Sequence, residues 1–209
     1  MVKKQEILRV AAQLLKEHGY DKTTYKIIAD ALGISKSIIT YHFKSKPLLV
    51  SYIFEEYINE ISKHIKSNLT SDCNCYLHRS IIDICLYREV LKNDMNKNLF
   101  FHEDLLKLWS EEKLSSIEGY IQEIANDFNV NILKEDIYIN AVICQSVKKG
   151  LFYEYKRNPR FISEYKLCNA IASMTGILSG LDESTVLKNL MRAYEFIDRY
   201  SYPKIDLLN

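Results

Sequence analysis

The sequence has few of the residues that most often interrupt regular structure, with only 3 Pro and 6 Gly among its 209 residues. Between them, apolar residues recur every three or four positions, which is the helical period, and the alternation typical of β-strands is hard to find. There is no run of 18 apolar residues, and the N-terminus mixes charged and apolar residues instead of carrying a signal peptide's apolar block. We therefore predict an all-α, cytoplasmic protein that does not enter the membrane.

Cysteine is also scarce, and the five cysteines are an odd number, unlike the disulfide framework of a small secreted protein. Charge is unevenly distributed although the net charge is only +1. Residues 1–46 hold nine Lys or Arg against four Asp or Glu, and the rest of the chain holds 19 basic and 23 acidic residues. A solvated charged face is the simple explanation of this surplus. The other is a polyanionic partner, which we would expect at the N-terminal segment.

Three helices are predicted in this basic segment. The first covers about residues 3–18 and ends at Gly19, where a left-handed cap is expected. The second follows three N-cap candidates, Asp21, Thr23 and Thr24, and ends at Gly33, and the third begins at the N-cap Ser35.

A long fourth helix is predicted to start near Ser45 and Pro47 and to run to about residue 67. The apolar spacing predicts further helices at 76–92, 97–108, 110–128, 134–157, 161–179 and 183–200.

Residues 25–44 have the arrangement of a helix-turn-helix. Ala29 is small where two helices would cross, and Gly33 lies in the turn, where a positive φ costs glycine nothing. The helix after Ser35 would enter the DNA major groove with its N-terminal residues at the base edges, while Phe43 is expected in the core. The residues expected to contact bases or phosphates are Thr24, Tyr25, Ser35, Lys36, Ser37, Thr40, Tyr41, His42 and Lys46.

The segment ILRVAAQLLKEHGYDKTTYKIIADALGISKSIITYHFKSKPLL, about residues 7–49, resembles the TetR family of repressors. The resemblance rests on the ordered set Gly19, Thr23, Thr24, Ala29, Gly33, Ser35, Tyr41, Phe43 and Lys46. It implies an N-terminal three-helix DNA-binding domain (1–47) and a larger helical bundle for effector binding and dimerisation (48–209). Ser37 and Thr40 depart from the family pattern, in which glycine and tyrosine are common at these positions, so the operator sequence stays open.

The resemblance implies a ligand-responsive repressor that binds palindromic double-stranded operator DNA as a homodimer and is released by a small-molecule effector. An effector cavity would be lined by aromatic and polar side chains of the C-terminal region. Its candidates are Tyr87, Phe101, His102, Trp109, Tyr120, Gln145 and Tyr153, for each of which core packing is the simpler explanation. Candidates for the dimer interface are Ser173, Gly176, Gly180, Leu187, Leu190, Met191, Tyr194 and Ile197, with packing inside one subunit as the alternative.

No catalytic residue, metal site or cofactor is predicted. Cys73, Cys75 and His78 lie close enough to suggest a zinc or copper site, but a fourth ligand is missing and incidental thiols are the simpler explanation. The sequence lacks Glu-x-x-His, G-x-S-x-G, H-E-x-x-H and a phosphate-binding glycine loop, which argues against an enzyme. A regulator that works through a protein partner, or an activator, is the alternative that the sequence leaves open.

Overall fold

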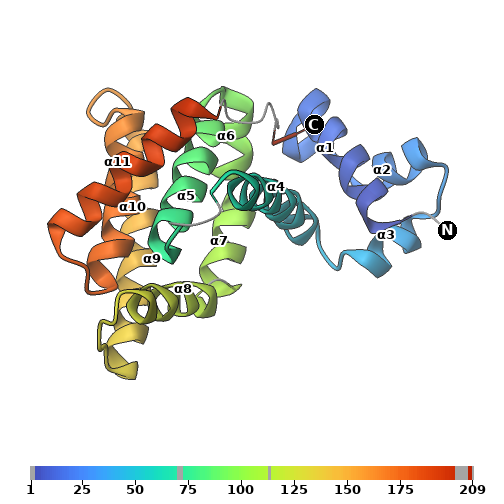
Figure 1. Cartoon of the computed structure of the whole chain (residues 1–209). Coiled ribbons are helices and arrows are strands. Elements are labelled where there is room, and N and C mark those ends of the chain that lie inside the picture. Colours follow the sequence, from blue (N-terminus) through green and yellow to red (C-terminus); the bar gives the residue numbers. More distant parts are fainter. Residues whose placement is uncertain (1–2, 70–72, 113, 201–206, 209) are drawn as a thin grey trace. The chain divides into compact units, whose positions relative to one another are not determined.

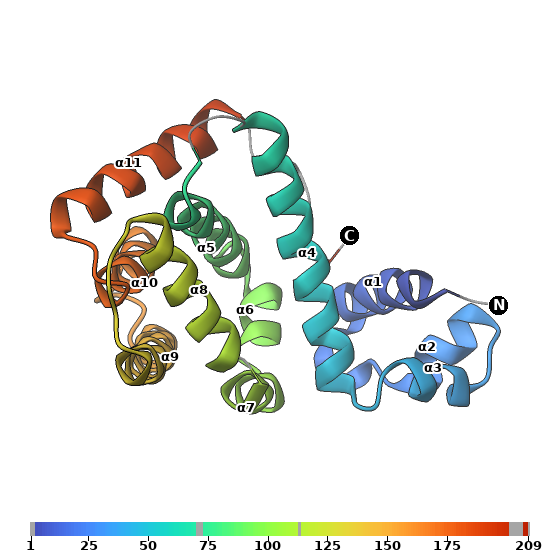
Figure 2. The same cartoon turned by 60° about the horizontal axis from the view of Figure 1, so that its bottom comes forward.

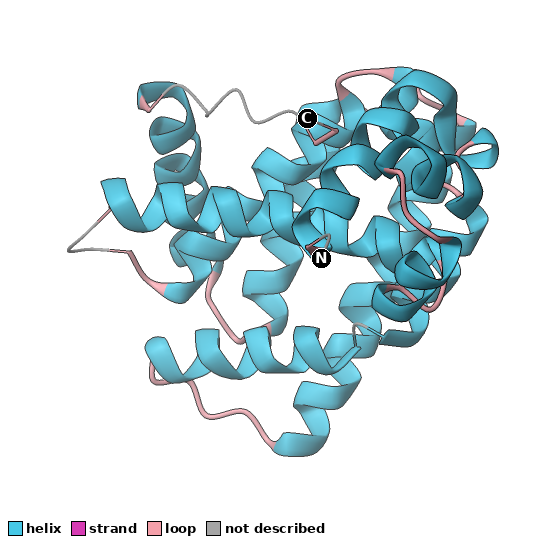
Figure 3. Ribbon diagram, turned by 90° about the vertical axis from the view of Figure 1, so that its right-hand side faces the viewer, coloured by secondary structure: helices cyan, strands magenta, loops and turns pink. Residues whose placement is uncertain are grey.

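The computed structural model describes residues 3–69, 73–112, 114–200 and 207–208, and all regular structure in these residues is helical (Figure 3). The predicted all-α class is therefore confirmed. None of the described helices is both long and apolar enough to cross a membrane. In chain order (Figure 1), the helices are α1 (Lys4–Lys22), α2 (Tyr25–Leu32), α3 (Lys36–His42), α4 (Lys46–Asn68), α5 (Cys75–Leu91), α6 (Asp94–Phe100), α7 (Glu103–Glu112), α8 (Leu114–Asp127), α9 (Lys134–Arg157), α10 (Glu164–Leu178) and α11 (Glu183–Arg199).

The chain divides by its internal packing into two compact units. The first, here called the N-terminal unit, contains residues 1–60, 89–109 and 204–209. The second, here called the helical unit, contains residues 61–88 and 110–203. These units are defined by packing and each joins separate stretches of chain, so the functional division predicted at residue 47 stays a prediction.

Helix α1 buries one face and is interrupted where the sequence predicts its end. Ile7, Ala11 and Leu15 recur at helical spacing and are buried. Gly19 has φ 77° and ψ 175°, a conformation that is essentially restricted to glycine. The chain then makes one more turn to Lys22, so the helix extends beyond the predicted residue 18 across a kink.

Helices α2 and α3 form the predicted helix-turn-helix beside α1 (Figure 2). Thr24 caps α2, because its hydroxyl oxygen accepts a hydrogen bond from the Ile27 amide at 3.3 Å. Gly33 ends α2 in the left-handed conformation, with φ 63° and ψ 32°. Ala29 is buried, and its carbonyl accepts the Ile34 amide at 3.0 Å, which closes the turn.

The predicted helix over residues 97–108 is wrong, because the chain breaks at Phe101 and His102 between α6 and α7. The Asn93 side chain caps α6 by accepting the Asn96 amide at 2.8 Å, so this helix starts earlier than predicted. Phe101 has φ −89° and ψ 11°, which leaves the helical conformation. Helix α7 extends to Glu112 and α8 starts at Leu114, so the helix predicted to begin at residue 110 starts later than expected.

In the helical unit, α9 packs against α8 and α10, and α10 packs against α11. Ile121 of α8 and Ile137 and Ala141 of α9 form a buried cluster between the first pair. Gly176 of α10 is tightly enclosed, because a Cβ atom there would lie 2.7 Å from Tyr76 Cζ and 2.8 Å from Val186 Cγ2. Its small size therefore serves packing within the chain.

Candidate nucleic-acid interface

Helix α3 divides its side chains between core and solvent. Ile39, and Phe43 just after the helix, are completely buried and hold α3 to the N-terminal unit. Tyr41 keeps 84% of its exposure, which excludes a core role for it. Lys36, Ser37 and Thr40 are also exposed. The helix therefore presents a row of hydrogen-bonding side chains to solvent, as a groove-reading helix must.

Two hydroxyls of α3 are committed to local bonds. The Ser35 and Ser37 hydroxyls lie 2.7 Å apart, and Ser35 makes no side-chain cap bond, so the predicted capping role of its hydroxyl is wrong. Thr40 donates its hydroxyl to the Lys36 carbonyl at 3.1 Å. Within the part of the chain that the structure describes, no hydrogen bond or ion pair holds the Lys36 ammonium or the Tyr41 hydroxyl. These two groups are the donors of α3 most available to DNA.

Tyr25 is held inside the N-terminal unit. Its hydroxyl donates to the Phe43 carbonyl at 3.0 Å, and burial raises its pKa to about 12. Tyr25 thus joins the start of α2 to the end of α3, and its proton is not free for a phosphate oxygen. Thr24 differs, because its hydroxyl oxygen accepts a bond and its proton is still able to donate.

Lys46, at the start of α4, is also tied to the end of α1. Its Nζ atom donates to the Tyr20 carbonyl at 2.8 Å and lies 3.9 Å from the centre of the Tyr20 ring. Burial lowers the pKa of Lys46, and the carboxylates of Asp21 and Asp104 partly oppose this. An ammonium group has three donors, so two remain for a DNA phosphate.

Tyr20 is the centre of a polar cluster that also includes the start of α7. The Tyr20 hydroxyl donates to Asp104 Oδ2 at 3.1 Å, and burial together with the Asp104 carboxylate raises the Tyr20 pKa. The His102 ring lies 3.9 Å from the Tyr20 ring, and its Nε2 atom is 3.4 Å from Asp21 Oδ1. Sequence reasoning missed Tyr20 and Asp104, because they are 84 positions apart and no motif pairs them.

The seven candidate effector-contacting residues are divided between the two units. Phe101 and His102 belong to the N-terminal unit, and Phe101 is buried against the Phe100 ring. The helical unit contains Tyr87, Tyr120, Gln145 and Tyr153. Tyr87 is buried against Phe152, whereas Tyr153 is 68% exposed. The side chain of Trp109 lies outside the described residues. A contact with an effector stays a prediction for each of them.

The segment with Cys73, Cys75 and His78 makes ordinary structural contacts. The Cys75 amide donates to Asp127 Oδ2 at 2.7 Å, and His78 Nε2 lies 3.1 Å from the Ser62 hydroxyl. Burial and the Asp127 carboxylate raise the Cys75 pKa, the opposite of what a reactive thiolate requires. No group of three or more potential His, Cys, Asp or Glu ligands occurs among the residues whose placement is described.

Known proteins resemble the part of the chain that contains this interface. Residues 7–53 match the family of bacterial regulatory proteins, tetR family. The HTH-type transcriptional repressor KstR2 of Rhodococcus jostii (strain RHA1) is 36% identical over 59 residues, which are 28% of this chain and 29% of that protein. KstR2 of Mycolicibacterium smegmatis (strain ATCC 700084 / mc(2)155) is 32% identical over 57 residues, which are 27% of this chain and 28% of that protein.

The alignment with these curated relatives therefore spans less than a third of their length. Among solved structures, AmtR of Mycobacterium smegmatis overlaps 95% of both chains at 14% identity, with a TM-score of 0.47. The segment of residues 7–53, which contains the helix-turn-helix, therefore matches the tetR family of bacterial regulatory proteins, in agreement with the resemblance seen in the sequence.

Proposed function

We propose that this protein is a ligand-responsive transcriptional repressor without enzymatic activity. It binds palindromic operator DNA as a homodimer, and a small-molecule effector releases it. The observation that carries this proposal is the exposure of Lys36, Ser37, Thr40 and Tyr41 along one short helix that is anchored by the buried Ile39. Lys36 and Ser37 lie in the first turn of α3, the end of a recognition helix that contacts base edges.

A homodimer is supported by apolar side chains that one subunit leaves in solvent. On α11, Leu187 and Met191 are four positions apart and are 52% and 65% exposed. Ile177, on the neighbouring α10, is also exposed. Two other candidates, Leu190 and Ile197, are buried within their own subunit. A two-fold dimer would place its recognition helices about 34 to 36 Å apart, one turn of DNA.

The switch we propose acts through the cluster around Tyr20. Lys46 begins α4 and Asp104 lies in the first turn of α7, and both contact Tyr20 at the end of α1. Each of these two helices has residues in both units. An effector that displaces α4 or α7 would therefore strain the contacts that position the helix-turn-helix. Such coupling is reciprocal and typically about 1 to 3 kcal/mol.

Selection of binding sites from random double-stranded DNA tests the proposal. We expect enrichment of a palindrome whose half-sites are about one helical turn apart. Enrichment of a single, non-repeated site would contradict the dimer, and no enrichment would contradict the DNA-binding function. Thermal melts with small molecules test the effector, because a ligand selective for the folded state raises the melting temperature.

A further inference from the structure

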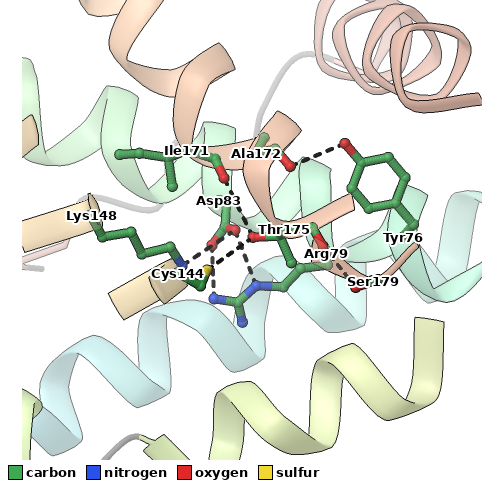
Figure 4. A network of polar contacts seen from close by, with 9 residues as sticks. All are labelled: Tyr76, Arg79, Asp83, Cys144, Lys148, Ile171, Ala172, Thr175 and Ser179. Atoms are coloured by element: carbon green, nitrogen blue, oxygen red, sulfur yellow. Dashed lines mark hydrogen bonds and ion pairs between the residues drawn. The ribbon is translucent and has the colours of Figure 1, made fainter. Parts of the chain in front are cut away.

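The helical unit contains a charged cluster in its interior, here called the Asp83 cluster and formed by Arg79, Asp83 and Lys148 (Figure 4). Asp83, on α5, is completely buried. One turn earlier, Arg79 donates its Nε–H to Asp83 Oδ2 at 3.1 Å. Its Nη2 atom lies 2.9 Å from Oδ1, outside hydrogen-bond geometry. From α9, the Lys148 Nζ atom approaches Oδ2 at 3.9 Å.

This cluster holds two cations and one carboxylate. Burial lowers the pKa of Arg79 and of Lys148, but the Asp83 carboxylate and other neighbouring groups together outweigh this effect, and the pKa of both is raised, so both stay charged. Tyr87 is a further strong electrostatic neighbour of Lys148, and burial raises its pKa to about 12, so it is neutral at physiological pH. One positive charge is therefore left in excess. A largely buried charge without a counter-ion is costly, and a bound anion would reduce that cost.

The two cations also have N–H donors that make no hydrogen bond among the described residues. Asp83 contacts only Nε and Nη2 of Arg79, and among the described residues no hydrogen bond or ion pair is found for the third guanidinium nitrogen. A guanidinium has five N–H donors in a planar fork, which fits a carboxylate or phosphate. Lys148 donates no hydrogen bond in the described structure, since its contact with Asp83 is an ion pair. The side chains of Arg79 and Lys148 are each 16% exposed to solvent, so a ligand can reach them although the Asp83 side chain is completely buried.

Aromatic side chains lie close to these donors. The Tyr120 ring lies 4.2 Å from the Arg79 guanidinium carbon, and Tyr87 packs edge to face on Phe152. Tyr87 and Tyr120 are two of the candidates for effector contact in the sequence. An apolar surface with a few convergent polar groups is the usual composition of a small-molecule site.

We propose that Arg79 and Lys148 bind the carboxylate or phosphate group of an organic anion whose apolar body lies against Tyr120. That this anion is the effector rests on the function proposed above, whereas its binding does not. On this proposal, the effector belongs to the class of acidic small molecules, and hydrophobic cations are excluded as effectors.

Matched pairs of acids and their neutral amides test the charge requirement. Benzoate, phenylacetate and hexanoate are compared with benzamide, phenylacetamide and hexanamide, and phenyl phosphate tests the phosphate arm. The full-length protein is melted with each compound at constant ionic strength. We expect at least one acid, and not its amide, to raise the melting temperature, by about 5 °C at about 100 times its dissociation constant. No shift with any acid, or equal shifts with an acid and its amide, would overturn the proposal.

Lys148→Met locates the binding site, and Lys149→Met is its control, because Lys149 is the exposed neighbour and loses the same charge. We expect the shift to disappear in Lys148→Met and to persist in Lys149→Met. Without ligand, Lys148→Met should melt at the wild-type temperature or above, because Arg79 alone neutralises Asp83. A retained shift would contradict the assignment, and so would a clear fall in the ligand-free melting temperature, which would mark Lys148 as a structural partner. These melts contain no DNA, so they are independent of the operator selection.

Discussion

The Lys46 ammonium and the Tyr20 carbonyl, 2.8 Å apart, join the start of α4 to the end of α1. The same ammonium lies over the Tyr20 ring, whose hydroxyl donates to Asp104 in α7. The expected DNA contact Lys46 therefore also holds the helices of the N-terminal unit together. A residue with both roles is suited to couple the position of α4 to the position of the helix-turn-helix.

Lys46→Ala is expected to lower the free energy of unfolding by about 1 kcal/mol, because it removes a charge-assisted hydrogen bond and a cation–π contact. It should also weaken binding to all DNA sequences and reduce the slope of log K against log salt by about one unit. Urea denaturation and salt titrations measure the two effects. Lys44→Ala, which removes an exposed charge two positions away, is the control for stability. A weaker complex with an unchanged salt slope would mean that Lys46 positions α4 without touching a phosphate.

Gly176→Ala is expected to destabilise the protein by about 1 to 3 kcal/mol, because the added methyl group would lie 2.7 Å from Tyr76 Cζ. Gly119→Ala is the matched control, since Gly119 also lies within a helix but a Cβ atom there would meet nothing within 4 Å. We expect this control to be stabilised by about 0.5 to 1 kcal/mol. Urea denaturation gives both values, and equal effects of the two substitutions would refute the close approach at Gly176.

Asp182 should make part of the stability depend on acidic pH. It caps α11 by accepting hydrogen bonds from the Ser184 hydroxyl at 2.6 Å and from the Thr185 amide at 3.0 Å. The bonds from Ser184, and then those from Thr185, lower its pKa below the ordinary 3.8. A carboxyl group with a lowered native pKa stabilises the fold above its unfolded pKa and loses this effect as the pH falls through the native value.

Asp182→Asn should consequently melt below the wild type at pH 7, and the two melting temperatures should converge as the pH falls below about 3.8. Circular dichroism melts between neutral and acidic pH measure this. Asp136→Asn, an exposed first-turn residue of α9, controls for the change in net charge. A difference that stays constant over the whole range would rule out titration of the cap.

Local signals were sufficient for the helix-turn-helix. Gly33 has the left-handed conformation expected of it, and Thr24 caps α2 through its own side chain. Gly19 has a positive φ, but with ψ 175° it forms a kink in α1 and not the left-handed cap that was predicted. Ser45 caps α4 by accepting the Leu48 amide. Each of these features depends on residues within a few positions, so a short stretch of sequence determines it.

Long-range contacts could not be predicted in this way. The break between α6 and α7 was missed because the apolar period continues through Phe101, and the cap at Asn93 carries little signal by itself. In the Asp83 cluster, the spacing of Arg79 and Asp83 is that of a helical ion pair, but nothing in the sequence indicates that Lys148 joins them. Tyr20 and Asp104 meet only through tertiary packing.

The central claim is that α3 reads duplex DNA, and fluorescence anisotropy with a labelled selected operator and a random duplex tests it most directly. At low ionic strength, we expect the wild type and the control Lys134→Ala, an exposed charge at the start of α9, to bind the operator equally. Lys36→Ala should lose about 1 to 3 kcal/mol on the operator, and much less on random DNA, because a base contact is removed. Failure of the wild type to bind any duplex at low salt would contradict the account, as would equal losses for Lys36→Ala on both duplexes.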